Sequence, residues 1–272
     1  MTHDPLSILV IGAHPDDPDY YAGGTTALWV AAGHTVRYVT LTNGDAGHRT
    51  MRGEELAQRR RAEAAAAGKV LGVEYVTLDN SDGTLLPTLE LRSQVIAEIR
   101  RAEADLVLTH RPYDYHADHR YTGQAVQDGA FLTIVGNLVP EVPPLPRAPL
   151  VMFMWDPFQK PYPFRPDIVV DVDPVMQQKL TALDCHTSQF YEWLDHGEPM
   201  RIPAEREARL AWLADALAFE MVPQAESYRR QLQEAYGEEH GRAVRYAEAF
   251  EHCEYGAPLT AAMRKRLFPF LD

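Results

Sequence analysis

The sequence predicts an α/β protein with a Rossmann-like, mostly parallel sheet flanked by helices, followed by a mainly helical C-terminal part. Short apolar segments alternate with longer helical segments through the first half of the chain. The first apolar segment, residues 7–11, shows no polar alternation, as is typical of a strand buried on both faces of a parallel sheet. The last hundred residues contain mainly helical patterns.

We expect the 272 residues to form a single domain, because a chain that is 46% hydrophobic can bury one large core. Within it, residues 1–137 are the expected Rossmann-like core of strands and helices. Residues 138–172 contain a proline-rich loop and additional strands, and residues 173–272 form the helical C-terminal part.

The first three elements form a strand–helix–strand unit. After the strand at 7–11, residues 24–32 read as a helix that ends at Gly33, and residues 35–41 are rich in β-branched and aromatic side chains. The alternation continues with helices expected at about 53–69, 88–102 and 119–136, and with strands at 74–78 and 105–109.

The second half of the chain begins with a proline-rich surface loop at residues 140–146. Strands are expected at 150–154 and 168–172, and the aromatic, proline-stiffened loop between them is a candidate wall of a substrate pocket, with a packed surface loop as the alternative. The C-terminal helices are expected at 174–193, 203–221, 223–235 and 242–251.

Composition excludes several classes of protein. A formal charge of −13 argues against a nucleic-acid partner, because such binding depends on cationic side chains. Cys185 and Cys253 fit neither a disulfide framework nor a cysteine zinc site, so we expect a reduced, cytoplasmic protein. No apolar run approaches the roughly 18 residues of a membrane span, and no signal-peptide pattern is present at the N-terminus.

Two clusters of imidazoles and carboxylates each follow a predicted strand. Residues 14–17, His-Pro-Asp-Asp, come after the first strand, and residues 116–119, His-Ala-Asp-His, come after the strand at 105–109. Ligand sites of open α/β sheets lie at the carboxyl ends of the strands, so we expect the two clusters to meet there. Either cluster alone is more typical of a capped turn, but the conjunction favours a metal site.

The two clusters contain the groups that metal-assisted amide hydrolysis needs. His14, Asp17 and His119 supply three ligands of a catalytic zinc site. A metal held there lowers the pKa of its bound water, and Asp16 is placed to accept the proton as general base.

We expect His116 to have a different role in the same site. As an imidazolium it is expected to stabilise the oxyanion or protonate the leaving amine. Asp118 is expected to hold the tautomer and charge of this ring.

The two clusters together resemble the motifs of the PIG-L/LmbE-like family of zinc-dependent N-deacetylases, which includes N-acetylglucosaminyl deacetylases. The resemblance extends over most of the chain, at residues 42–45, 60–63, 71–72, 82–83, 179–189 and 246–250. It implies the same metal ligands and the same base. It also implies Zn²⁺ as cofactor, with another divalent metal such as Fe²⁺ as the alternative, and a homo-oligomeric protein.

The resemblance implies further that Arg60 and Asp82 contact polar groups of the substrate, although a helix-surface salt bridge is an equally weighted alternative for Arg60. Asp45 is a third candidate for substrate binding. Together with Asp45, residues Tyr21, His48 and Trp155 are candidates for shaping specificity, with packing as the alternative.

Two positions depart from the family pattern. Pro18 stands where an acidic residue is common, with Asp19 one step further, and Ala117 stands where proline is usual. Any support that the missing acid gives must therefore come from Asp19 or be absent.

The leading hypothesis is a hydrolase that removes an acetyl group from a small N-acetylated substrate, an N-acetylamino sugar or its conjugate. One alternative is a deacylase of another small N-acyl amide. A second is a non-catalytic sugar- or nucleotide-binding module, although the glycines from Gly12 to Gly24 do not give the GxGxxG spacing. A third, an assembly or regulatory subunit, has no support beyond the acidic surface.

Overall fold

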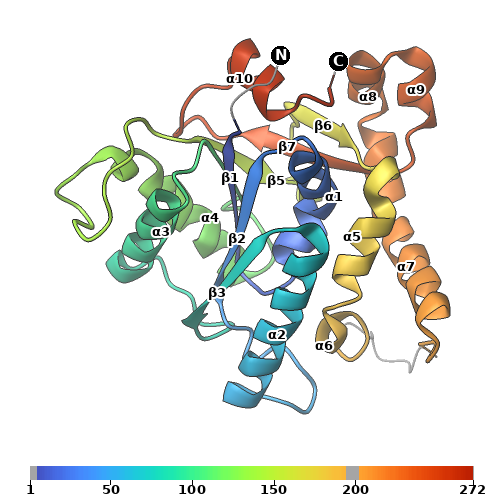
Figure 1. Ribbon diagram of the computed structural model, residues 1–272, viewed down its shortest axis with the longest axis horizontal. Coiled ribbons are helices and arrows are strands. Elements are labelled where there is room, and N and C mark those ends of the chain that lie inside the picture. The colour runs from blue at the N-terminus through green and yellow to red at the C-terminus, as the bar shows by residue number, and fades with distance from the viewer. Residues whose placement is uncertain (1–4, 194–201, 272) are drawn as a thin grey trace.

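The computed structural model describes residues 5–193 and 202–271, and these residues form one seven-stranded sheet in the order β3-β2-β1-β4-β5-β7-β6 (Figure 1). β1 to β5 run parallel, and β7 pairs antiparallel with both β5 and β6. The strands are β1 (Ser7–Gly12), β2 (Thr35–Thr42), β3 (Glu74–Asn80), β4 (Leu106–Thr109), β5 (Leu150–Met154), β6 (Ile168–Asp171) and β7 (Ala247–His252).

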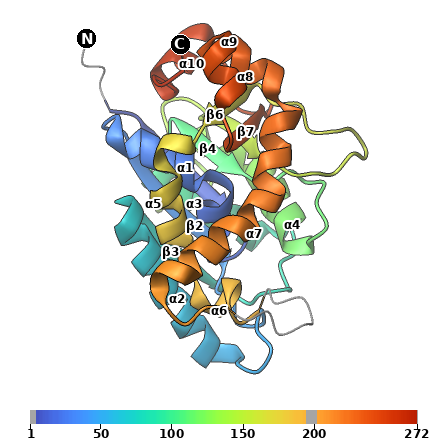
Figure 2. The same cartoon turned by 90° about the vertical axis from the view of Figure 1, so that its right-hand side faces the viewer.

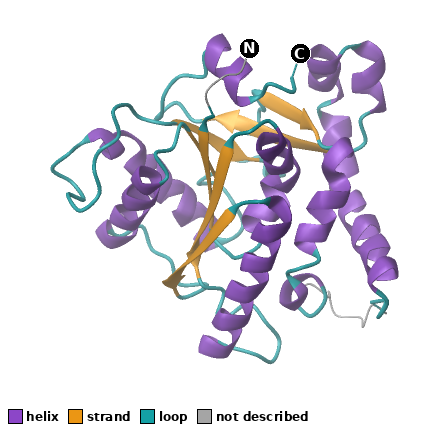
Figure 3. Cartoon of the chain, viewed as in Figure 1, coloured by secondary structure: helices purple, strands orange, loops and turns teal. Residues whose placement is uncertain are grey.

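Helices cover both faces of this sheet, as the colouring by secondary structure shows (Figure 3). One face carries α1 (Asp17–Ala31), α2 (Gly53–Leu71), α5 (Met176–Leu183), α7 (Arg206–Ser227) and α10 (Ala261–Leu267). The other carries α3 (Leu89–Arg101), α4 (Ala117–Ala130) and α8 (Arg229–Tyr236). Short elements complete the chain: α6 (Thr187–Phe190), α9 (Glu238–Ala243) and the 3₁₀ turns Phe131–Ile134 and Asp173–Val175. Figure 2 shows α7 running along the outside of the first layer.

The apolar run of β1 faces two cores. Ile8 and Val10 pack into the core on the α1 face, whereas Leu9 and Ile11 pack into the core on the α3 and α4 face. Both sides of the strand are therefore dry, which explains why its sequence does not alternate. The predicted α/β class with a mostly parallel sheet is confirmed. Because all three predicted parts of the chain contribute strands to one sheet, we propose that they form a single domain.

Several predicted boundaries are wrong. α1 begins at Asp17 and not at residue 24, because Pro18 occupies the first helical turn, where no intrahelical acceptor awaits its missing N–H. α7 continues through Pro223 to Ser227, and the helix predicted at 174–193 is divided into a 3₁₀ turn, α5 and α6. The helix predicted to start at residue 203 starts at Arg206. Residues 194–201, just before it, lie outside the described residues.

The helix predicted at 242–251 is the largest error, because residues 247–252 form strand β7. Alanine and glutamate favour helix, and this local preference produced the prediction. The segment is instead buried between β5 and β6, and pairing with both strands outweighs the propensity of its residues.

Glu248 of β7 joins three elements through a buried ion pair. Its carboxylate accepts the main-chain N–H groups of Gly24 and Thr25 of α1, at 2.9 and 2.7 Å, and it lies 2.6 Å from Nζ of Lys179 in α5. Lys179 also donates to the carbonyl of Tyr20. The pair thus bonds to main-chain groups of α1, the helix that follows the first motif.

Replacing Lys179 by methionine should destabilise the fold by about 3–5 kcal/mol, because it leaves the buried Glu248 carboxylate without a counter-charge. Urea unfolding followed by circular dichroism measures the change. As a matched control, Arg230→Met removes one partner of an exposed pair with Glu234 and should change the midpoint little. Equal midpoints for the two variants would contradict the role of the buried pair.

Candidate active site

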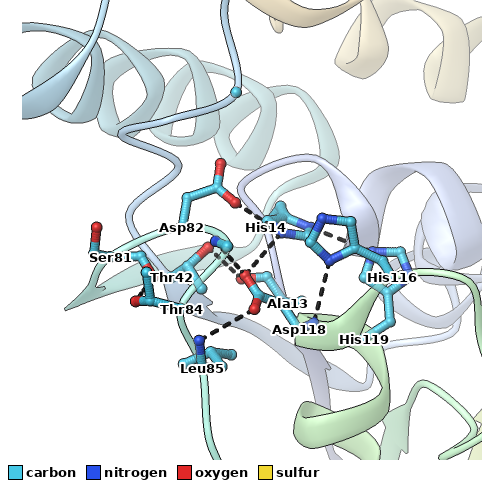
Figure 4. Close-up of polar contacts among 12 residues, drawn as sticks. Ala13, His14, Thr42, Ser81, Asp82, Thr84, Leu85, His116, Asp118 and His119 are labelled. Atoms are coloured by element: carbon cyan, nitrogen blue, oxygen red, sulfur yellow. Dashed lines mark hydrogen bonds and ion pairs between the residues drawn. The ribbon is translucent and has the colours of Figure 1, made fainter.

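The two predicted motifs meet at the carboxyl ends of two neighbouring strands. β1 ends at Gly12, and the chain turns through residues 13–16 before α1 begins. β4, which pairs with β1, ends at Thr109, and the chain turns before α4 begins at Ala117. The adjacency of β1 and β4 therefore brings the rings of His14, His116 and His119 together (Figure 4).

His14, Asp17 and His119 lie close together, and Asp17 faces the two imidazoles through different oxygens. Nδ1 of His14 lies 3.2 Å from Nε2 of His119 and 3.4 Å from Oδ2 of Asp17, and Oδ1 of Asp17 lies 3.4 Å from Nε2 of His119. Ligand atoms about 2.0–2.2 Å from a tetrahedrally bound zinc ion lie about 3.3–3.6 Å apart. The spacing of this trio therefore fits a divalent metal.

Other combinations of the same side chains are also compact enough to hold a metal. Among the described residues, three overlapping groups have ligand atoms within 4.8 Å of one another: His14, His116 and His119; Asp17, His110 and His119; and His14, Asp82 and Asp118. His14 and His119 each occur in two of them. The cluster as a whole is therefore a candidate metal centre.

The nitrogens of His14 and His119 that face away from the trio point at carboxylates. Nε2 of His14 lies 3.2 Å from Asp82 and 3.4 Å from Asp118, and Nδ1 of His119 lies 3.2 Å from Asp114. Carboxylates in this position fix the orientation and tautomer of metal-binding histidines. The outward nitrogens face these carboxylates at ion-pair distance but make no hydrogen bond among the described residues.

Asp118 does not have the contacts that its sequence position suggested. Its carboxylate accepts the main-chain N–H groups of Gly83 and Leu85, at 2.7 and 3.1 Å, and faces His14 (Figure 4). The role expected for Asp118, to hold the tautomer and charge of His116, stays a prediction, and the carboxylate itself is turned to His14. The main-chain N–H of Asp118 donates instead to Nδ1 of His116, at 3.2 Å. This bond places the ring proton of a neutral His116 on Nε2.

The charge expected for His116 also differs. Burial lowers the pKa of His116, and the neighbouring His14 and His119 lower it further, more than Asp118 and Asp82 raise it. These surroundings favour the neutral imidazole of His116. An N–H donor rather than a full charge is what this side chain offers.

Asp17 is fixed by its own main chain and by His110. Its Oδ2 accepts the N–H groups of Ala13 and His14, at 2.9 and 2.7 Å, and lies 3.1 Å from Nε2 of His110. Because all these contacts use Oδ2, the other carboxylate oxygen, Oδ1, is free to face His119. Burial opposes ionisation of Asp17, but His119 and His110 outweigh it and hold the pKa of this carboxyl well below its usual range.

The carboxylates around His119 favour its protonated form. Burial lowers its pKa, whereas Asp17 and Asp114 raise it, and the outcome is a pKa of about 9. The pKa of His14 is likewise well above its ordinary value, because Asp118, Asp17 and Asp82 outweigh burial. Without a metal, protons therefore neutralise this acidic cluster.

Asp16 lies beside the trio and pairs with Arg60. Oδ1 of Asp16 is 2.9 Å from Nη2 of Arg60, whose Nη1 lies 3.8 Å from Asp82. Arg60 is only 2% exposed, so the alternative of a helix-surface salt bridge is wrong. Burial raises the pKa of Asp16, with Arg60 opposing and Asp17 adding to the rise. A raised pKa suits a carboxylate that must accept a proton near neutral pH.

The segment at residues 42–45, one of those that resemble the family, leaves space for the side chain of Arg60. Gly44 has a φ of +71°, which favours glycine, and a Cβ at this position would lie 2.5 Å from Nη1 of Arg60. Asp45 does not reach the cavity. Its oxygens accept from the hydroxyl of Ser81 and from the main-chain N–H of Asp82, each at 2.9 Å. Asp45 therefore positions the turn that carries Asp82, and its predicted contact with substrate stays a prediction.

A cavity of about 610 Å³ opens over these groups. His14, Asp16, Asp17, Arg60, Asp82, His116 and His119 all line it. Tyr21 lines it as well, with its ring edge-on to His110 at 5.4 Å between centroids. The loop between β5 and β6 contributes Asp156, Pro157 and Phe158, so the prediction that this loop walls the pocket agrees with the cavity.

The other candidates for specificity have packing roles. His48 pairs with Glu192 at 2.9 Å, and Trp155 donates to the hydroxyl of Tyr228 at 3.2 Å. Neither is among the described residues that line the cavity.

Asp19 has a partner that accounts for the unusual Pro18. Asp19 lies 2.9 Å from Nε2 of His186, and both side chains are fully buried. His186 follows α5, so this pair ties the first turns of α1 to the segment between α5 and α6. Asp19, one position after Pro18, thus forms a buried pair with His186.

Sequence reasoning missed His110 and Asp114 as members of the site. The ring of His110 stacks on His119 with centroids 4.0 Å apart, and Asp114 accepts the main-chain N–H of His116 at 2.9 Å while facing His119. Their positions just after β4 were the available signal, because the end of a strand places neighbouring side chains in the same crevice.

The fold and the site define a candidate metal-binding enzyme, and comparison with known proteins identifies the family. The profile described as "PIG-L: GlcNAc-PI de-N-acetylase" matches residues 9–130, which contain both motifs. A diacetylchitobiose deacetylase of Thermococcus kodakarensis is 33% identical over 201 residues, which cover 70% of this chain and 72% of that protein. The chain therefore belongs to the PIG-L family of deacetylases.

Two further similarities show the range of the family. A 4-oxalmesaconate hydratase of Pseudomonas putida is 27% identical over 71% of this chain and 78% of its own length. The solved structure of N,N'-diacetylchitobiose deacetylase from Pyrococcus horikoshii, complexed with its inhibitor MPG, has a TM-score of 0.70 at 25% identity. That match covers 91% of this chain and 84% of that one. Both the sequence and the fold are thus shared along most of the chain.

The metal-free protein should become less stable as pH rises from 6.5 to about 9, because His119 loses its stabilising positive charge over this range. Because its pKa is raised by folding, its contribution is fully present below pH 6.5 and is lost as pH passes about 9. One proton changes the free energy of unfolding by at most about 1.4 kcal/mol per pH unit. Thermal unfolding of chelator-treated protein across this range measures the slope. The His119→Gln variant should show a shallower slope, and an unchanged slope would contradict the assignment.

Proposed function

We propose that this protein is a zinc-dependent N-deacetylase that hydrolyses the acetamide of an N-acetylamino sugar or of its conjugate. The observation that carries the proposal is the pairwise spacing of His14, Asp17 and His119, at 3.2–3.4 Å between side-chain nitrogen and oxygen atoms, beside the partly buried carboxylate of Asp16. Membership of the PIG-L family supports the amide as the bond that is cleaved.

His14, Asp17 and His119 hold the metal in this proposal. Two imidazoles and one carboxylate are a ligand set of catalytic zinc sites, and they suit other divalent metals such as Fe²⁺ as well. When bound, such an ion acidifies water and polarises a carbonyl group. Asp82, Asp118 and Asp114 act behind the ligands by fixing the rings of His14 and His119.

Asp16 is the general base. It accepts a proton from the water whose oxygen attacks the amide carbon, and its raised pKa makes it an adequate acceptor near neutral pH. Arg60 holds this carboxylate through one Nη2 contact of 2.9 Å, which fixes its position. The C–N bond then breaks, the amine takes up a proton, and acetate is released.

His116 stabilises the oxyanion that forms on the amide oxygen. Its Nδ1 accepts the N–H of Asp118, so the neutral ring offers its Nε2–H to the cavity. Donors placed before the reaction begins need no reorganisation as charge develops. Asp118 assists indirectly, because its main chain orients His116 and its carboxylate orients His14.

The substrate is the least specific part of the proposal. Arg60 and Asp82 line the cavity and are available to polar groups of a sugar, whereas Asp45 acts through the turn that holds Asp82. The family description names GlcNAc-PI, and a relative is named for diacetylchitobiose, which supports an N-acetylglucosamine-type substrate. Another small N-acyl amide would fit the same machinery. The hydratase relative makes addition of water to a double bond a further outcome to test.

The remaining expectations stay predictions. We still expect a homo-oligomeric protein in the cytoplasm, and the proposed metal site depends on neither expectation. Within the described part of the chain, no helix has the length and apolar character of a membrane span.

Asp16→Asn should retain the metal and lower kcat by about 10²–10⁴-fold, because the variant loses the general base but none of the proposed ligands. Asp17→Ala and His119→Ala should lose both metal and activity. Elemental analysis by mass spectrometry and release of free amine from N-acetylglucosamine measure the two properties. Full turnover by metal-free protein, or loss of metal from Asp16→Asn alone, would contradict the assignment.

His116→Gln should lower kcat by about 10²–10³-fold with little change in KM or metal content, because an oxyanion donor acts in the transition state. Steady-state kinetics on zinc-loaded protein measures this effect. A variant whose KM rises while kcat is unchanged would instead place His116 in ground-state substrate binding.

A further inference from the structure

Arg111 is a buried cation that the proposed chemistry does not use. It follows His110 directly after β4, and its side chain is fully buried. A buried guanidinium is costly unless each of its donors is satisfied, so the partners of Arg111 indicate what it does.

Among the described residues, the hydrogen-bond partners of Arg111 lie in the loop between β5 and β6, and its Nη1 also lies 3.8 Å from a carboxylate oxygen of Glu251 in β7. Nε and Nη2 each lie 2.6 Å from an oxygen of Asp156 in a bidentate pair. The guanidinium also donates to the carbonyls of Phe158 and Tyr162, at 3.0 and 3.2 Å. Its Cζ lies 5.3 Å from the ring centre of Tyr162 and 5.4 Å from that of Phe164. One side chain thus bonds to the loop from residue 156 to residue 162.

This loop separates the active-site cavity from a second hollow. We call the second one the outer chamber: about 460 Å³, lined by Pro112, Tyr113, Asp114, Tyr115, Arg120, Phe158, Gln159 and Lys160. Phe158, Tyr115 and Asp114 line both spaces. The rings of Tyr115 and Phe158 are 6.2 Å apart between centroids, so they form the boundary between the two.

The opposite side of this boundary is also held by an arginine. Arg120 of α4 donates to the carbonyls of Asp114 and Tyr115, at 2.7 and 3.0 Å. Tyr115 and Phe158 are therefore attached to fixed main chain on both sides, and the side of Phe158 depends on Arg111.

We propose that Arg111 is a positioning residue that holds Phe158 at this boundary and thereby sets how well the enzyme binds substrates that extend beyond the acylated ring. A substituent that leaves the active-site cavity on this side lies across the edge formed by Phe158 and Tyr115 and reaches the outer chamber. This inference rests on the proposed deacetylase function, since it concerns the binding of the same substrate.

Lysine cannot replace Arg111 in this role. An ammonium group on a flexible stem keeps the charge beside Asp156, but it cannot bind the carboxylate in a bidentate manner and also reach two carbonyls. Arg111→Lys should therefore loosen the loop while leaving a positive charge at the same place.

The test compares a short and a long substrate. For Arg111→Lys, KM for the β-linked disaccharide N,N'-diacetylchitobiose should rise by about three- to tenfold, whereas kcat and KM for N-acetylglucosamine should stay within about twofold. Metal content should be unchanged. Phe158→Ala, which leaves the arginine contacts in place, should reproduce the effect on the disaccharide. Arg147→Lys is the matched control, because Arg147 pairs with Asp105 at 2.6 Å on an exposed surface away from the loop.

Hydrogen exchange gives a readout that does not depend on activity. The main-chain N–H of Phe158 donates to Asp156 at 2.9 Å, and its exchange should accelerate in Arg111→Lys but not in Arg147→Lys. Equal losses of kcat on both substrates, lost metal, or unchanged exchange would overturn the positioning role. If the wild-type protein releases amine from neither sugar, the proposed function fails, whereas the exchange experiment still decides whether Arg111 holds the loop.

Discussion

The site depends on a balance of buried charge at the ends of β1 and β4. Asp17 lies between two imidazoles, and each outward imidazole nitrogen faces further carboxylates. In the absence of a metal, the surrounding carboxylates raise the pKa values of His14 and His119 and so favour their protonated forms. A divalent cation supplies the same positive charge without those protons. The cluster is accordingly arranged for a bound cation. The same buried charges affect both the stability of the fold and the proposed binding of the metal.

Much of this was predictable from the sequence, for identifiable reasons. The apolar run of β1 and the β-branched run of β2 predicted a parallel sheet, because buried strands have no polar alternation. Once these strands were placed, the rule that sites lie at carboxyl ends brought residues 14–17 and 116–119 together. Strand β7 was missed because Glu248 and its alanine neighbours favour helix locally, and only pairing with β5 and β6 makes them a strand.

The finer roles in the site could not be predicted, because they depend on which partner a side chain faces. Asp118 and His116 are two residues apart, yet the carboxylate turns to His14 and only the main chain contacts His116. Asp45 similarly bonds to the turn at residues 81–82 rather than facing the cavity. The bidentate contact of Arg111 with Asp156 joins segments 45 residues apart, and no local pattern marks it. Long-range hydrogen bonds, rather than motif spacing, decide these roles.

Anomalous diffraction at the zinc absorption edge, from crystals grown with Zn²⁺, tests the central claim most directly. The account predicts one strong peak about 2.0–2.2 Å from Nδ1 of His14, from a carboxylate oxygen of Asp17 and from Nε2 of His119. A peak between His14, Asp82 and Asp118, which form one of the alternative compact groups, would contradict the ligand assignment. The absence of any peak in the cluster would contradict the metal site itself.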